Sequence, residues 1–78
     1  MQNLSRIYQL LDRAGCPSCT KALITAVFQA TRRGSRFKMS RQAFRHGTDA
    51  RYAQEQELLS QNEDESLVFT EKALGLIQ

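Results

Sequence analysis

Apolar side chains recur at three- and four-residue spacing at the start of the chain, as they do on one face of an amphipathic helix. The pattern predicts a first helix over Leu4–Ala14, which Gly15 ends. A second helix begins at Pro17, a residue suited to a first helical turn, and Gly34 ends it. Its apolar residues cover a wide face, so we expect this helix to be central. These residues are Ala22, Leu23, Ile24, Ala26, Val27, Phe28 and Ala30.

The pattern changes in the middle of the chain. Ser35–Met39 alternates apolar with basic side chains, which predicts a short strand with one basic, solvent-facing side. Ser40 can cap a short helix that Gly47 ends. Thr48 can cap a longer helix that extends from Asp49 to about Gln61. A short helix, a turn that contains glycine and a second helix together form the pattern of a helix-turn-helix.

The end of the chain adds one strand and one helix. An acidic loop, Asn62–Ser66, precedes a strand over Leu67–Phe69. Thr70 and Glu71 begin a final helix that extends through Ile77. The predicted order is therefore α-α-β-α-α-β-α, within one domain that covers residues 1–78. The predicted fold class is mostly α with a small β component.

Positive and negative charges occupy separate stretches of the chain, although the net charge is only +3. The first stretch carries only basic residues: Arg32, Arg33, Arg36, Lys38, Arg41 and Arg45. The second is acidic apart from Arg51, and its acids are Asp49, Glu55, Glu57, Glu63, Asp64, Glu65 and Glu71. A block of positive charge on a small domain gives a surface that attracts phosphate, which favours a nucleic-acid partner.

The stretch from Ser35 through Gly75 resembles winged-helix regulators of transcription. The resemblance rests on the helix-turn-helix with flanking strands and on the segment Leu67-Val68-Phe69-Thr70-Glu71-Lys72-Ala73-Leu74. Many such regulators end in a strand that runs into a Thr-Glu-Lys helix start. The resemblance implies a winged-helix-like domain that binds DNA. The usual wing is a two-stranded hairpin, whereas this pattern predicts only one strand after the second helix of the motif. We therefore expect almost no wing, and pairing between the Phe37 and Val68 regions.

In a helix-turn-helix the second helix enters the major groove and presents its first residues to base edges. The candidate base contacts are Thr48, Arg51, Tyr52 and Gln54. The candidate phosphate contacts, which position the protein without reading sequence, are Arg36, Lys38, Arg41 and Arg45. We expect a regulator that binds duplex DNA as a homodimer. The residues that could form a dimer interface, or else close the core, are Leu58, Leu59, Leu74, Leu76 and Ile77.

A different class of function remains open: a small adaptor or inhibitor that binds a protein. Its basic block would engage an acidic protein or a larger complex that handles nucleic acid. Glu55 and Glu57 favour this alternative, because carboxylates on the proposed DNA-reading helix repel phosphates.

The string Cys16-Pro17-Ser18-Cys19 is the sharpest short motif. With its flanking residues it is similar to the active site of glutaredoxins, which implies Cys16 as nucleophile and Cys19 as resolving thiol. The preceding segment is predicted helical where that fold requires a strand, so this enzyme is a minor alternative. The two thiols also supply half of a zinc site, but His46 is the only histidine and there is no third cysteine. The favoured interpretation is structural, with Cys19 in the core and Cys16 at a turn.

The remaining features indicate a cytoplasmic protein without catalytic activity. No apolar run is long enough to span a bilayer, and the first residues lack the layout of a signal peptide. No Ser-His-Asp set, phosphate-binding glycine loop or carboxylate pair stands out, so we expect no enzyme and no cofactor. His46, before Gly47, suits a helix C-terminus better than a catalytic base.

Overall fold

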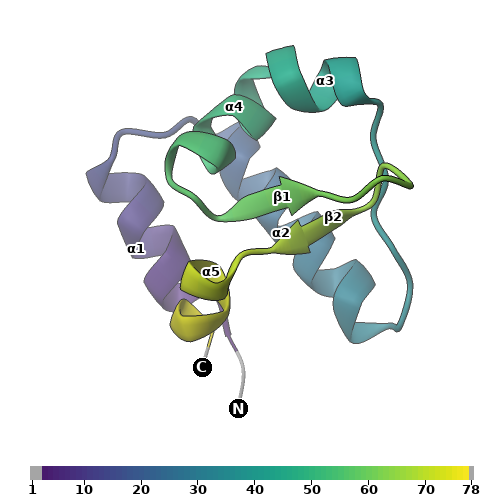
Figure 1. Ribbon diagram of the computed structural model, residues 1–78. Coiled ribbons are helices and arrows are strands. Elements are labelled where there is room, and N and C mark those ends of the chain that lie inside the picture. The colour runs from purple at the N-terminus through teal and green to yellow at the C-terminus, as the bar shows by residue number, and fades with distance from the viewer. Residues whose placement is uncertain (1–2, 78) are drawn as a thin grey trace.

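A computed structural model describes residues 3–77 of the chain. This part is mostly helical, with one small antiparallel sheet of two strands (Figure 1). The elements in order are α1 (Ser5–Arg13), α2 (Ser18–Arg32), α3 (Arg41–His46), α4 (Thr48–Glu55), β1 (Leu59–Gln61), β2 (Leu67–Phe69) and α5 (Glu71–Leu76). The prediction of a mostly helical fold with a small β component is therefore confirmed.

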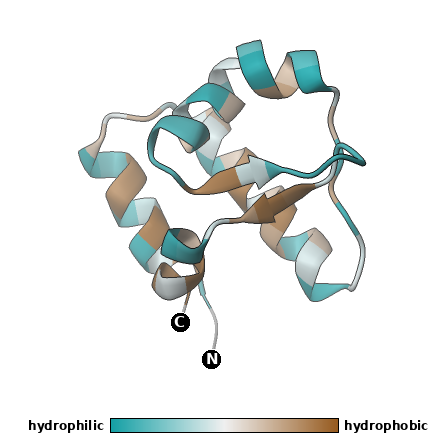
Figure 2. Cartoon of the chain, viewed as in Figure 1, coloured by the Kyte–Doolittle hydropathy of each residue, from teal (hydrophilic) through white to brown (hydrophobic). Residues whose placement is uncertain are grey.

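Helix α2 is the longest element, and the predicted central position agrees with its packing. Helix α4 packs against α2, while α1 contacts both α2 and α5. Figure 2 shows apolar segments on α1, on α2 and on both strands. These elements enclose one core, whose buried apolar members are Leu4, Ile7, Leu11, Leu23, Ile24, Val27, Phe28, Phe44, Ala50, Ala53, Leu58, Leu59, Leu67, Ala73 and Ile77.

Two helix starts agree with the sequence at the level of single hydrogen bonds. Ser40 caps α3, because its hydroxyl accepts a bond of 3.0 Å from the Ala43 amide. Thr70 caps α5 in the same way, through a bond of 3.2 Å from the Ala73 amide. Each bond satisfies one of the amides that a helix leaves without a partner in its first turn. At α2 the capping position is Pro17 itself, which lies just outside the helix instead of within its first turn.

The predicted helix from Asp49 to about Gln61 is wrong in its second half. Helix α4 ends at Glu55, and Glu57 then turns the chain with a φ of 58°. The apolar pair that follows, Leu58 and Leu59, fits a helix face or the inner face of a strand equally well. The structure places both in the core and begins β1 at Leu59.

Strands β1 and β2 form a hairpin, so two strands follow α4 and the predicted loss of the hairpin is also wrong. Ser60 lies opposite Val68 in an antiparallel register. The expected strand at Ser35–Met39 is reduced to one bridge, between Lys38 and Ser66, so the observed order is α-α-α-α-β-β-α. The amide of Leu67 donates to the Phe37 carbonyl at 2.8 Å, so this segment lies along β2 as the pairing of the Phe37 and Val68 regions required.

Most of the apolar residues proposed for a dimer interface instead close the monomer's core. Leu58, Leu59 and Ile77 are buried, and Leu76 packs partly buried against them. Leu74 differs, because 54% of it is exposed. Within residues 3–77, no helix combines the length and the apolar character needed to cross a membrane.

Candidate nucleic-acid interface

Helices α3 and α4 meet at a single residue, Gly47. It ends α3, through a bond of 2.8 Å from its amide to the Ala43 carbonyl, and it also precedes the first residue of α4. A Cβ at this position would lie 2.6 Å from the Ala43 carbonyl oxygen, closer than any carbon packs against backbone. Glycine is therefore required by the close approach of the two helices.

The start of α4 differs from the prediction. Thr48 is the first helical residue and not the cap, because Gly47 takes the capping position. The Asp49 carboxylate instead accepts a bond of 2.7 Å from the Ala50 amide, and its negative charge lies in the first turn, where the helix dipole favours it. The side chain of Thr48 is thus left exposed at the front of the helix.

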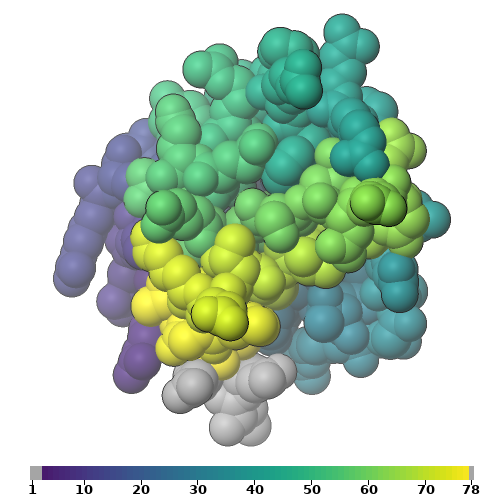
Figure 3. Space-filling view, in the orientation of Figure 1, coloured from purple at the N-terminus to yellow at the C-terminus, as the bar shows by residue number. Residues whose placement is uncertain are grey.

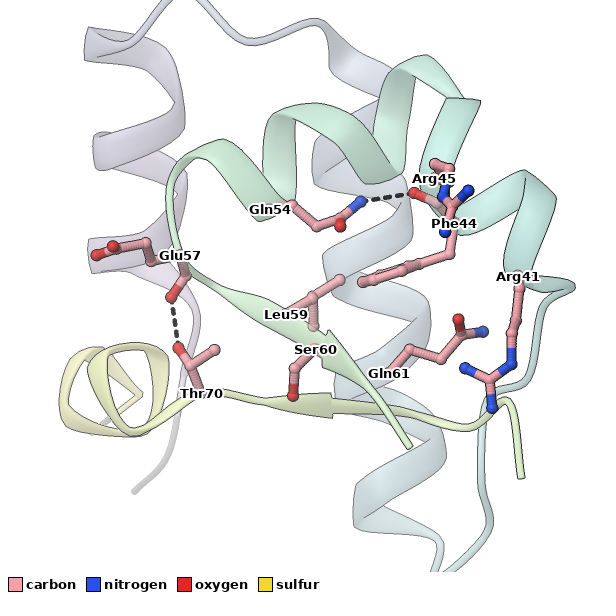
Figure 4. Close-up of a pocket in the computed structure, with 9 residues that line it drawn as sticks. All are labelled: Arg41, Phe44, Arg45, Gln54, Glu57, Leu59, Ser60, Gln61 and Thr70. Carbon is pink, nitrogen blue, oxygen red and sulfur yellow. Dashed lines mark hydrogen bonds between the residues drawn. The ribbon is translucent and has the colours of Figure 1, made fainter. Parts of the chain in front are cut away.

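Helix α4 is held against the rest of the molecule by its inner face. Ala50 and Ala53 are fully buried, and the Thr20 hydroxyl of α2 donates to the Asp49 carbonyl at 3.3 Å. Gln54 holds α4 to α3, because its amide nitrogen donates to the Phe44 carbonyl at 2.6 Å (Figure 4). This nitrogen is therefore engaged within the protein, although the sequence prediction assigned Gln54 to a base.

The opposite face of α4 is turned to solvent. Thr48, Arg51 and Glu55 are exposed there, and Tyr52 is half-buried. Their positions, i, i+3, i+4 and i+7, form one stripe along a helix. The stripe combines a cation, a hydroxyl and an aromatic ring, which can all contact base edges, with one carboxylate, which cannot face a phosphate without repulsion.

The four predicted phosphate contacts fall into two pairs. Arg36 forms an ion pair of 2.8 Å with Asp64. The Arg41 guanidinium donates to the Glu63 carbonyl at 2.6 Å, so it too is engaged within the protein. Lys38 and Arg45 are exposed and take part in neither of the two ion pairs found within residues 3–77.

Arg36 and Arg41 are both bound by the turn of the hairpin, Asn62–Ser66, which we call the hairpin tip. Its Asp64 carboxylate also accepts bonds from the Ser66 amide at 3.1 Å and hydroxyl at 2.6 Å. These bonds, with the Arg36 guanidinium beside them, lower the pKa of Asp64 to about 2. Figure 3 shows the tip against the segment that precedes α3. The tip is thus a well-bonded acidic turn that lies on part of the basic block.

A hollow of about 540 Å³ lies between α3, α4 and β1 (Figure 4). Arg45 contributes a cation to its lining and Glu57 an anion, so the hollow has no single sign of charge. The residues that line it are Arg41, Phe44, Arg45, Gln54, Glu57, Leu59, Ser60, Gln61 and Thr70. It separates the helix-turn-helix from the exposed side of the hairpin.

The cysteines are placed opposite to the prediction. Cys19 is exposed, whereas Cys16 is half-buried and packs against the core. Burial raises the pKa of the Cys16 thiol, and the nearby Glu55 carboxylate adds to this shift. Thiol nucleophiles need a lowered pKa, so the environment of Cys16 acts against the glutaredoxin-like alternative. Within the described residues, no three His, Cys, Asp or Glu side chains come together as a possible metal site.

The sequence analysis missed the contact between the hairpin tip and the basic block. The signal was present as charge, since an acidic run follows a basic run of similar length, but nothing local indicated that the two would meet. In comparisons with known proteins, no family model, no curated protein and no solved structure matches this chain.

Proposed function

We propose that this chain is a winged-helix-like domain that binds duplex DNA and regulates transcription. The observation that carries the proposal is the pair α3–α4, joined tightly at Gly47, with one face of α4 fixed to α2 and the other exposed. A helix held in this way can enter a major groove as a rigid body. The hairpin that follows α4 and the bridge at Lys38 also fit a winged-helix arrangement.

The exposed stripe of α4 supplies the base contacts of this proposal. Arg51 is its central residue, because a guanidinium can form two hydrogen bonds with guanine. Thr48 and Tyr52 flank it on the same face. Arg45 and Lys38 contact phosphates, since both are exposed and outside the ion pairs of the described chain.

The active form in this proposal is a homodimer, because paired half-sites are commonly bound by two-fold symmetric proteins. The exposed leucine on α5, Leu74, is the residue we assign to the dimer interface. It is the most exposed large apolar side chain reported for residues 3–77, and Leu76 lies half-buried on the same helix.

The direct experiment measures binding of the intact protein to random duplex DNA over a series of salt concentrations, by fluorescence anisotropy. Three available cations, Lys38, Arg45 and Arg51, give an expected log–log slope of about −2.7 per protomer, at about 0.9 for each phosphate neutralised. Absence of binding at low salt would reject DNA binding as the function.

The second candidate is a protein-binding adaptor, and one observation favours it. The hairpin tip engages Arg36 and Arg41, and Glu55 lies on the exposed stripe of α4, so the positive surface is smaller than the sequence suggests. An adaptor needs charge complementarity to its partner but no helix that reads bases. The salt series separates the two candidates, since only the DNA-binding domain gives the steep slope on random duplex.

A further inference from the structure

The segment Arg36–Arg41, which we call the basic segment, is joined to the hairpin tip along its whole length. At one end Arg36 pairs with Asp64 at 2.8 Å. In the middle the Met39 amide donates to the Glu65 carbonyl at 3.3 Å. At the other end the Arg41 guanidinium donates to the Glu63 carbonyl at 2.6 Å.

The tip supplies both acceptors and negative charge at this contact. Carboxylate and carbonyl oxygens occupy donors of Arg36 and Arg41 that a phosphate would otherwise use. Glu63 and Glu65 are exposed beside them, and the Glu65 carboxylate also accepts a bond of 3.3 Å from the Arg41 amide. A DNA phosphate that approaches the basic segment must therefore displace one anion and come close to two more.

We infer that the hairpin tip is an internal competitor for phosphate, which keeps the basic segment from DNA and so limits binding to random sequence. This inference rests on the proposed function and specifies which part of the surface is excluded from it. The tip does not enter a groove as a wing, and contact with DNA is confined to α3, α4 and the exposed Lys38.

The consequence for the protein is greater sequence discrimination. Phosphate contacts supply essentially all of the affinity for random DNA, whereas base contacts distinguish one site from another. A tip that removes one arginine from the phosphate contacts lowers affinity for all sequences equally. Random sites are far more numerous than specific ones, so limiting this common term reduces the share of protein held on random DNA.

The test uses two double variants of the full chain with the same change in net charge. Asp64→Asn with Glu65→Gln removes the carboxylates that contact the basic segment but keeps an acceptor at position 64 for Ser66. Glu57→Gln with Glu71→Gln removes two exposed carboxylates near the other end of the hairpin, as Figure 4 shows for Glu57. Both proteins are titrated on random duplex over the same salt series as the unmodified protein.

One arginine released at the tip steepens the salt slope by about 0.9, which corresponds to about eightfold tighter binding at 0.1 M salt. The control pair is expected to keep the slope of the unmodified protein. Equal behaviour of the two pairs would overturn the inference and leave DNA binding intact. Absence of binding by every protein, including the unmodified one, would instead overturn the proposed function and the inference with it.

Glu63→Gln provides a second test if the double variant at the tip does not fold. Its side chain has no hydrogen bond or ion pair within the described residues, so the substitution removes charge without removing a contact. We expect tighter binding to random duplex than for Glu71→Gln, which also removes one exposed carboxylate. Equal affinity of these single variants would contradict a competing role for the tip.

Discussion

Arg36 and Asp64 are 28 residues apart in the chain, and their ion pair of 2.8 Å joins the segment before α3 to the tip of the β1–β2 hairpin. The pair is exposed at the surface, where an isolated ion pair contributes little to stability. Its setting differs from that of an isolated pair, because Ser66 donates two further bonds to the same carboxylate. The contact thus fixes the position of the tip more than it stabilises the fold.

Asp64→Asn should destabilise the protein at neutral pH and have a smaller effect in acid. The pKa of Asp64 is lowered from 3.8 to about 2, so its ionised form is favoured in the folded state. A group with a lowered pKa contributes stability above its unfolded value, and the contribution is lost as pH falls through its folded value. The urea midpoints of the two proteins should therefore differ by a constant amount down to about pH 4 and converge toward about pH 2. A difference that persists undiminished at the lowest pH would contradict this account.

Gly47→Ala should destabilise the fold by about 1–3 kcal/mol, the typical range for an overpacked site. The φ of Gly47 is −64°, so alanine is compatible with the backbone, and the expected cost comes from the approach of the Ala43 carbonyl oxygen. Gly75→Ala is the matched control. Gly75 lies in α5 with open space around it, so alanine should stabilise the protein by about 0.5–1 kcal/mol. Equal effects in urea unfolding would show that α3 and α4 do not approach as described.

Ser40→Ala should cost about 1 kcal/mol, because it removes the hydroxyl that caps α3. Thr48→Ala should change stability by less than about 0.5 kcal/mol, since Thr48 is exposed and follows the capping position. The comparison, made by urea unfolding, tests the observed start of α4 against the one that the sequence suggested. A loss at Thr48 as large as that at Ser40 would restore Thr48 as the cap.

How far the sequence predicted this fold depends on how local each signal was. Ser40 and Thr70 were assigned correctly, because a cap depends on a few neighbouring residues. The start of β1 was missed because Leu58 and Leu59 fit a helix or a strand, and the choice depends on the turn at Glu57 and on pairing with β2. Pairing between distant segments has no signature in the pattern of one segment alone.

The candidate site shows the same division. The exposed position of Arg51 follows from the helical spacing of its neighbours, so the sequence could predict it. The engagement of Gln54 by the Phe44 carbonyl, and of Arg41 by the hairpin tip, depends on how α3 is oriented toward α4 and the hairpin. These contacts removed three predicted residues, including Arg36, from the set of uncommitted side chains.

The two thiols should differ in reactivity. Cys19 is exposed, whereas Cys16 is half-buried and its pKa is raised by burial and by Glu55. Thiolate is the reactive form, so iodoacetamide at neutral pH should modify Cys19 before Cys16, as followed by mass spectrometry of the intact and digested protein. Substitution of both by serine should leave the salt slope on random duplex unchanged. Preferential modification of Cys16 would contradict the placement of these residues.

The central claim is that α4 reads base sequence, and its outer stripe allows a direct test. A preferred site is first selected from a random duplex pool, and each protein is then measured in competition between this site and a scrambled one. Arg51→Ala should lower discrimination by about 1–3 kcal/mol at one base pair, whereas Arg45→Ala, assigned to a phosphate, should weaken both complexes alike. Equal losses on both sites for Arg51→Ala would contradict the claim that α4 reads the sequence and favour the protein-binding adaptor.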